Sequence, residues 1–177
     1  RTCRRERADR LRGMNRSVTT ITRTGLVVAL GLGFPWVLHM AGAGQIGKFL
    51  LPMFLPIVGG AFFLPLGAAV FAGAATPFLS SVLTGMPPLA PPIAPIMMVE
   101  LAAMAGTVAL VYQKLRANVW VTITGAIIVD RLILAFLAAG LGKMLKLPPA
   151  MITWGTLVVG VPGLVLLFVV LPPVVAR

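Results

Sequence analysis

Six stretches of mostly apolar residues follow one another along the chain, separated by short breaks. A helix that crosses a bilayer needs about 20 apolar residues, within a range of roughly 17 to 25. The pattern therefore predicts an all-α polytopic membrane protein with six transmembrane helices. We expect them at residues 24–41, 49–64, 66–83, 93–113, 118–141 and 150–172.

The second and third stretches are short, and little more than Pro65 separates them. Proline inside a helix removes a hydrogen bond and clashes with the preceding turn. We therefore expect a hairpin of two short helices here rather than one long helix.

Composition supports a membrane domain over residues 24–177. Apolar residues make up 59% of the chain and charged residues 11%, whereas soluble domains carry about 25% charged residues. So few charges cannot cover a surface that faces water, so the surface must face lipid.

Residues 1–23 form a basic tail with a net charge of +6, out of +11 for the chain. We expect an unstructured cytoplasmic anchor, with Met14 as an alternative start residue and no cleaved signal peptide. Nucleic-acid binding is not expected, because no basic groove with interleaved aromatic residues follows the tail.

The basic residues also predict the orientation, because cytoplasmic flanks are rich in Lys and Arg. With the N-terminus inside, eleven basic residues lie on the inner side and three on the outer side. We therefore expect a multi-pass protein of the plasma membrane with both termini in the cytoplasm. The proline-rich segment 84–95 then lies outside, as a stiff, non-helical loop that serves as a plain connection or as a lid over a site.

Ionisable residues inside the predicted spans are the candidates for chemistry. Glu100 and Asp130 are the only acids after residue 23, and Arg131 follows Asp130. Such residues are costly in a membrane and normally face a bundle interior or a cavity. Glu100 is expected either to contact a substrate or to form a structural bond. Asp130 and Arg131 form either a buried pair that locks helices together or, through Arg131, a site for an anionic ligand group.

Further polar residues are predicted at the outer side of the membrane, around a pocket that opens outward. Met97 shares a helix face with Glu100, at a spacing of three residues. His39 and Trp154 are weaker candidates, as a surface histidine and an interfacial anchor. The set of candidate ligand contacts is Glu100, Ser80, Ser81, Thr84, Met97, Arg131, His39 and Trp154.

Small residues recur at every fourth position of the first span, at Gly25, Ala29 and Gly33. Such a stripe permits close contact between helices. It serves either internal packing or docking of another membrane subunit.

Signatures of enzymes are missing from the sequence. It has no nucleophile elbow, no phosphate-binding glycine loop and no HExxH motif. Two acids and one histidine in the membrane part cannot build a metal site. We therefore expect neither an enzyme nor a bound cofactor.

Three segments resemble the substrate-binding S components of energy-coupling factor (ECF) transporters. They are LPMFLP (Leu51 to Pro56), TPFLSSVLTGMPP (Thr76 to Pro88) and MMVELA (Met97 to Ala102). At Phe54 the chain departs from family members with the LPM segment, which often carry histidine at this position.

The resemblance implies six helices and a site that binds a vitamin or related micronutrient from outside. It also implies partners, namely a membrane T component and two cytoplasmic ATPases. The T component would contact Gly25, Ala29 and Gly33. The alternative is a structural subunit of another membrane complex, in which the polar residues only hold helices together.

Overall fold

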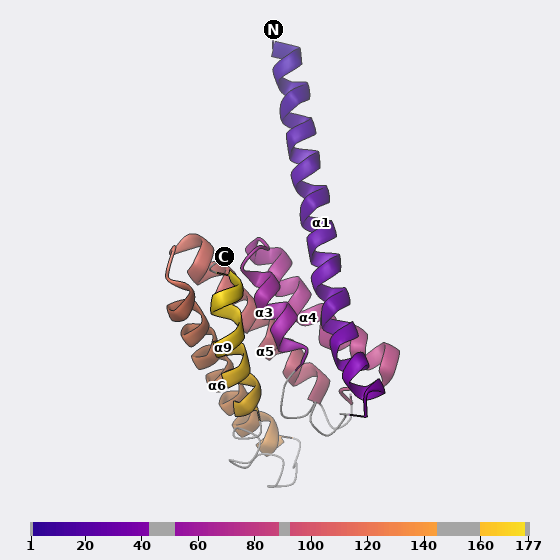
Figure 1. Cartoon of the computed structure of the whole chain (residues 1–177), viewed down its shortest axis with the longest axis vertical. Helices are drawn as coiled ribbons and strands as arrows, with labels where there is room; N and C mark the ends of the chain where they lie inside the picture. The colour runs from indigo at the N-terminus through magenta and orange to yellow at the C-terminus, as the bar shows by residue number, and fades with distance from the viewer. Residues whose placement is uncertain (1, 43–51, 89–92, 145–159, 176–177) are drawn as a thin grey trace.

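The computed structural model of the chain is all-helical, as the sequence predicts (Figure 1). It describes residues 2–42, 52–88, 93–144 and 160–175. A π-helical segment, η1 (Ala109–Lys114), continues α5. The α-helices within the described residues are α1 (Thr2–Met40), α3 (Phe54–Ala61), α4 (Leu66–Thr84), α5 (Ile93–Val108), α6 (Val119–Met144) and α9 (Val161–Val175).

Four helical segments are long and apolar enough to cross a membrane, which makes this a membrane protein. They are Met14–Leu38, Leu66–Thr84, Ile93–Lys114 and Val119–Leu137. Helix α9 is apolar but has 15 residues, and α3 has only eight. At 1.5 Å per residue, α3 is about 12 Å long and cannot cross a bilayer core of about 30 Å by itself. The expected number of six spans is therefore not established.

The predicted breaks between helices agree well with the structure, except around α3. Helix α4 begins one residue after Pro65, whose extended backbone ends the preceding turn, so the expected break is confirmed. The predicted helix 49–64 is wrong in extent, because α3 covers only Phe54–Ala61. Pro95, expected in the loop, lies in the first turn of α5, where proline is tolerated. Residues 150–159 lie outside the described residues.

The basic tail is helical, which corrects the expectation of an unstructured anchor. Helix α1 runs without a break from Thr2 to Met40. The tail is rich in Arg, which favours helices, and no proline precedes Pro35. The hydroxyls of Thr19, Thr20 and Thr22 also donate to carbonyls of the preceding turn. Helix α1 therefore projects well beyond the rest of the bundle (Figure 1).

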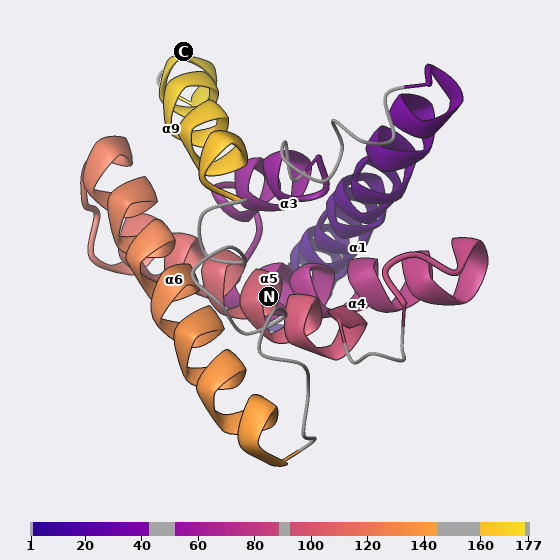
Figure 2. The same ribbon diagram turned by 90° about the horizontal axis from the view of Figure 1, so that it is seen from below.

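Among the described residues, successive helices alternate in direction, and α5 is the central helix (Figures 1 and 2). Helix α5 packs against α4, α6 and α3, while α1 packs against α4 and α3, and α9 against α6 and α3. The chain enters and leaves the bundle at one end, which also holds the α3–α4 and η1–α6 turns. We call this the turn end, and the opposite end, where α4 stops and α5 starts, the loop end.

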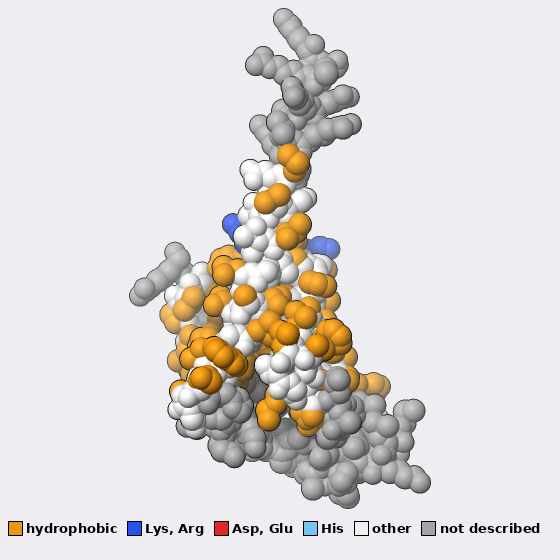
Figure 3. Space-filling model, turned by 90° about the vertical axis from the view of Figure 1, so that its right-hand side faces the viewer, with side chains coloured by type: hydrophobic (Ala, Val, Ile, Leu, Met, Phe, Trp, Pro, Cys, Tyr) orange, Lys and Arg blue, Asp and Glu red, His pale blue; other side chains and the backbone are white. Residues whose placement is uncertain are grey.

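Close helix approach depends on glycine at two places. A Cβ atom on Gly73 would lie 2.5 Å from the backbone oxygen of Leu101, so α4 and α5 touch there through their backbones. A Cβ atom on Gly31 would lie 2.8 Å from Cγ2 of Thr76, where α1 meets α4. The outer surface carries many large apolar side chains, as the lipid-facing prediction requires (Figure 3).

Candidate ligand-binding site

Glu100 lies on the inward face of α5, among apolar side chains. It is 6% exposed, and Leu101 and Met104 on the same helix are fully buried. It lies seven positions after Ile93, where α5 begins. It is therefore about 10 Å below the loop end of the helix.

Asp130 lies on the buried stripe of α6, in line with Ile123 and Ala126, and is 0% exposed. Its Oδ2 atom accepts two hydrogen bonds from Arg131, from Nε at 3.0 Å and from Nη2 at 2.8 Å. The predicted pair therefore forms, but between neighbours on one helix. It is possible because the long arginine side chain folds back along its own helix. Both of these hydrogen bonds lie within α6.

The two acids and Arg131 form one electrostatic cluster across the α5–α6 contact, because the charges of Asp130 and Arg131 both act on the Glu100 carboxyl. Within the described residues, Oε1 of Glu100 and Oδ1 of Asp130 are buried and accept no hydrogen bond. A buried polar atom without a partner costs about 1–3 kcal/mol, and more when it is charged. The described residues therefore leave two buried oxygen atoms of these acids unsatisfied.

The hydroxyl groups of Ser80 and Thr84 on α4, predicted to contact a ligand, donate hydrogen bonds to backbone oxygens. Ser80 donates to the backbone oxygen of Met86 at 2.7 Å, and Thr84 donates to that of Ser80 at 2.7 Å. Both bonds build the C-terminal turn of α4, which Gly85 closes in the left-handed conformation. Ser81 is buried beside them.

These hydroxyls are also apart from the acid cluster. Helices α4 and α5 run in opposite directions and touch at Gly73 and Leu101. Ser80 is therefore about two turns, or about 10 Å, nearer the loop end than Glu100. The structure thus brings together Glu100, Asp130 and Arg131, and leaves Ser80, Ser81 and Thr84 as a separate group above them.

The remaining predicted contacts are only partly described. Met97 is partly buried and packs against the core on the Glu100 side of α5. His39 lies in α1, but its side chain is outside the described part of the molecule. Trp154 lies outside the described residues altogether.

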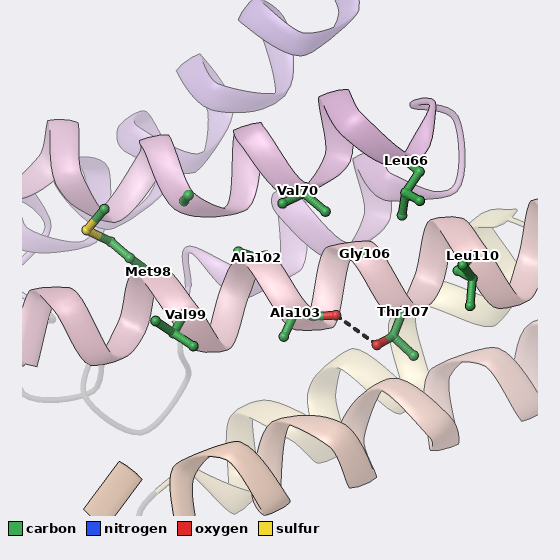
Figure 4. Close-up of a pocket in the computed structure, with 10 residues that line it drawn as sticks. Leu66, Val70, Met98, Val99, Ala102, Ala103, Gly106, Thr107 and Leu110 are labelled. Atoms are coloured by element: carbon green, nitrogen blue, oxygen red, sulfur yellow. Dashed lines mark hydrogen bonds between the residues drawn. The ribbon is translucent and has the colours of Figure 1, made fainter. Parts of the chain in front are cut away.

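A groove of about 650 Å³ lies between α5 and α4 (Figure 4). Its single hydroxyl, on Thr107, donates to the backbone oxygen of Ala103 at 2.8 Å. The groove thus offers a ligand no free polar side chain, and it is not the predicted polar pocket. Its lining is Leu66, Val70, Ala74, Met98, Val99, Ala102, Ala103, Gly106, Thr107 and Leu110.

The small-residue stripe on α1 lies on an open face. Nothing within 4 Å would meet a Cβ atom on Gly25 or Gly33, and Ala29 is exposed. The inward face of α1 is instead formed by Thr24, Val27 and Gly31. Within the described part of the chain, the stripe therefore does not serve internal packing.

Gln113 is a structural residue that sequence reasoning missed. Its Nε2 atom lies 3.2, 3.2 and 2.6 Å from the carbonyl oxygens of Ala61, Phe62 and Leu64. It therefore holds the turn between α3 and α4 against η1. The available signal in the sequence was a lone amide at the end of an apolar stretch.

No family model, curated protein or solved structure matches this chain. The case for a function therefore rests on the buried cluster and on the sequence motifs.

Proposed function

We propose that the chain is the substrate-binding membrane subunit of an ECF-type ABC importer. It captures a vitamin or related micronutrient from outside the cell and delivers it with a T component and two ATPases. The proposal includes six crossings of the plasma membrane, with α3 and α9 as parts of the second and sixth, and both termini in the cytoplasm. The three motifs that resemble ECF S components support it.

The observation that carries the proposal is the buried carboxyl group of Glu100. It lies in an apolar bundle, and its Oε1 atom has no partner among the described residues. On insertion scales, an acidic residue at the centre of a membrane helix costs roughly 2.5 to 3.5 kcal/mol. A residue that only holds helices together would offset this cost through a bond within the chain. For a residue that binds a ligand, this cost is offset only when the ligand is bound.

The open stripe on α1 supports a partner in the membrane. Gly25, Ala29 and Gly33 present a smooth face that no described residue covers. Small residues let two helix backbones approach closely in lipid. In the proposal this face is the contact with the T component.

A second candidate is a structural subunit of another membrane complex. It is favoured by the polar groups that are satisfied within the chain, namely the Asp130–Arg131 pair and the bonds of Ser80 and Thr84. It leaves the unpaired oxygen of Glu100 unexplained.

Purification from the native membrane separates the two candidates. An importer subunit should copurify with a small membrane protein and a pair of ATPases, and the complex in proteoliposomes should accumulate a small molecule only when ATP is present. Copurification with an unrelated complex would favour the structural subunit. Accumulation by this chain alone would contradict the proposed division of labour.

A further inference from the structure

We infer that the groove between α4 and α5 holds an acyl chain of an anionic phospholipid, whose phosphate is bound by Lys114 and Arg116 at the turn end. The inference concerns the lipid-facing surface of the fold. It goes beyond the proposed function and does not depend on it. It is carried by the shape of the groove and by the charges at one of its ends.

The groove is long, narrow and apolar (Figure 4). Its lining on α5 runs from Met98 to Leu110, a length of about 18 Å at 1.5 Å per residue. For a volume of about 650 Å³, this length gives a mean width of about 7 Å. A helix with its side chains is about 10–12 Å wide. A methylene chain is only about 4 Å thick, because carbon atoms touch at roughly 3.5–4.0 Å. The groove therefore admits acyl chains but not a whole helix.

The position of the groove exposes it to lipid. It lies between the two membrane-spanning segments Leu66–Thr84 and Ile93–Lys114. Val70, Val99 and Leu110 in its lining are exposed, and the single hydroxyl of the lining donates to a backbone oxygen. An apolar chain from the surrounding bilayer is therefore the group that this lining fits.

The groove ends beside two basic residues at the turn end. Leu66 and Leu110 are the lining residues nearest this end. Lys114 follows Leu110 by four positions, which is about one helical turn. The span Ile93–Lys114 also stops at this residue, so its ammonium group is placed at the membrane surface. Arg116 comes two residues later, where a positive φ of 51° turns the chain toward α6.

This basic pair lacks an acidic partner among the described residues. Both side chains are exposed, whereas Glu100 and Asp130, the acids that follow residue 23, are buried. Basic residues at the membrane surface attract anionic lipids, and a guanidinium group binds two phosphate oxygens at once. A zwitterionic lipid would bring its own cation close to the pair. An anionic phospholipid therefore matches the groove with its chain and the pair with its headgroup.

Lipid retention by the purified full-length protein tests the inference. The protein is transferred to mixed micelles with equal amounts of phosphatidylglycerol and phosphatidylethanolamine that have identical acyl chains. Native mass spectrometry then measures how much of each lipid stays bound. The double variant Lys114→Gln/Arg116→Gln removes the basic pair. Its control is Arg23→Gln, which removes an exposed charge from α1, a helix that does not line the groove.

A second pair of variants tests the groove itself. Ala103→Leu fills the groove with a larger side chain. Gly125→Leu is the control, because it adds the same side chain to α6, where nothing lies within 4 Å of the Cβ position.

The wild type should retain at least about fivefold more phosphatidylglycerol than phosphatidylethanolamine, because two basic residues act on the headgroup. The double variant should reduce this excess to less than about twofold, whereas Arg23→Gln should preserve it. Ala103→Leu should lower the retention of both lipids, and Gly125→Leu should not.

Equal retention of the two lipids by the wild type would overturn the inference, and this comparison needs no variant. An equal loss of the preference in Arg23→Gln would overturn it too, because only the overall charge would then matter. Normal lipid retention by Ala103→Leu, together with loss of a copurifying membrane protein, would assign the groove to that partner and overturn the lipid site.

Discussion

Glu100 and Asp130 are both buried acids, but they differ in what holds them. Asp130 has Arg131 as a hydrogen-bonded counter-ion, whereas Glu100 has no bond to lose within the described residues. The sequence indicates that both are unusual, because they are the only acids after residue 23. It cannot indicate that Arg131 folds back along its own helix, since that depends on the packing around α6.

This difference predicts opposite effects of two matched amide variants. Asp130→Asn weakens two charge-assisted bonds, each worth about 1.5–3 kcal/mol, so it should lower the midpoint of thermal unfolding. Glu100→Gln removes an unpaired acid and should leave the midpoint unchanged or higher. Unfolding of both variants in the same detergent decides the matter, and the reverse order of stability would show that Glu100 has a structural partner.

At the scale of helices, the sequence predicts most of the elements because apolar stretches and prolines are local features. Helix α4 begins at the predicted residue 66, and η1 ends within one residue of the predicted end at 113. The tail and α3 were predicted less well. The basic composition of the tail suggested an unstructured anchor although arginine favours helices, and the short α3 ends at Ala61 before Phe62 and Leu64 turn back toward Gln113.

The contact between α4 and α5 predicts a large effect of one methyl group. Gly73→Ala should destabilise the protein by roughly 2 kcal/mol or more, because the new Cβ atom would overlap the backbone oxygen of Leu101. Gly125→Ala is the control, since nothing lies within 4 Å of its Cβ position. That change should be neutral or stabilising by up to about 1 kcal/mol. Similar unfolding midpoints for the two variants would contradict the close approach of α4 and α5.

The two faces of α1 predict a separation of folding from assembly. Gly33→Leu places a side chain in open space, so it should leave unfolding unchanged but abolish copurification with the T component and ATP-dependent uptake. Gly31→Leu should destabilise the isolated protein, because Thr76 occupies that space. Normal assembly and uptake by the Gly33→Leu variant would remove the stripe from the partner interface.

For the whole molecule, the alternating helices bring the first and last helices out at the same end of the bundle (Figure 1). Charge then decides which side of the membrane this end faces. The tail, Lys114 and Arg116 all belong to the turn end. Since basic residues concentrate in the cytoplasm, the turn end is predicted inside and the loop end outside.

Cysteine labelling tests this orientation in intact cells. In a Cys3→Ser background, Met86→Cys at the loop end should react with a membrane-impermeant maleimide added from outside. Leu115→Cys at the turn end should react only after the cells are opened. Both wild-type side chains are well exposed, at 58% and 68%, so accessibility within the fold is matched. Labelling of Leu115→Cys in intact cells would reverse the orientation.

The grouping of the buried polar residues depends on contacts that no local pattern encodes. The sequence predicts one outer pocket shared by Glu100 and the α4 hydroxyls. The structure instead places Glu100 about 10 Å below the loop end of α5, whereas Ser80 and Thr84 are hydrogen-bonded in the last turn of α4, nearer that end. Which polar groups retain free atoms depends on the three-dimensional packing of α4, α5 and α6, so it required the structure.

The most direct test of the account is mass spectrometry of small molecules retained by the purified protein, with the wild type and Glu100→Gln compared under identical conditions. The account predicts that the wild type retains a vitamin-like small molecule. It also predicts that the folded Glu100→Gln variant binds this molecule about tenfold more weakly or worse. A wild-type protein that retains no small molecule, or a Glu100→Gln variant that retains it equally well, would contradict the central claim that this buried carboxyl group binds the transported substrate.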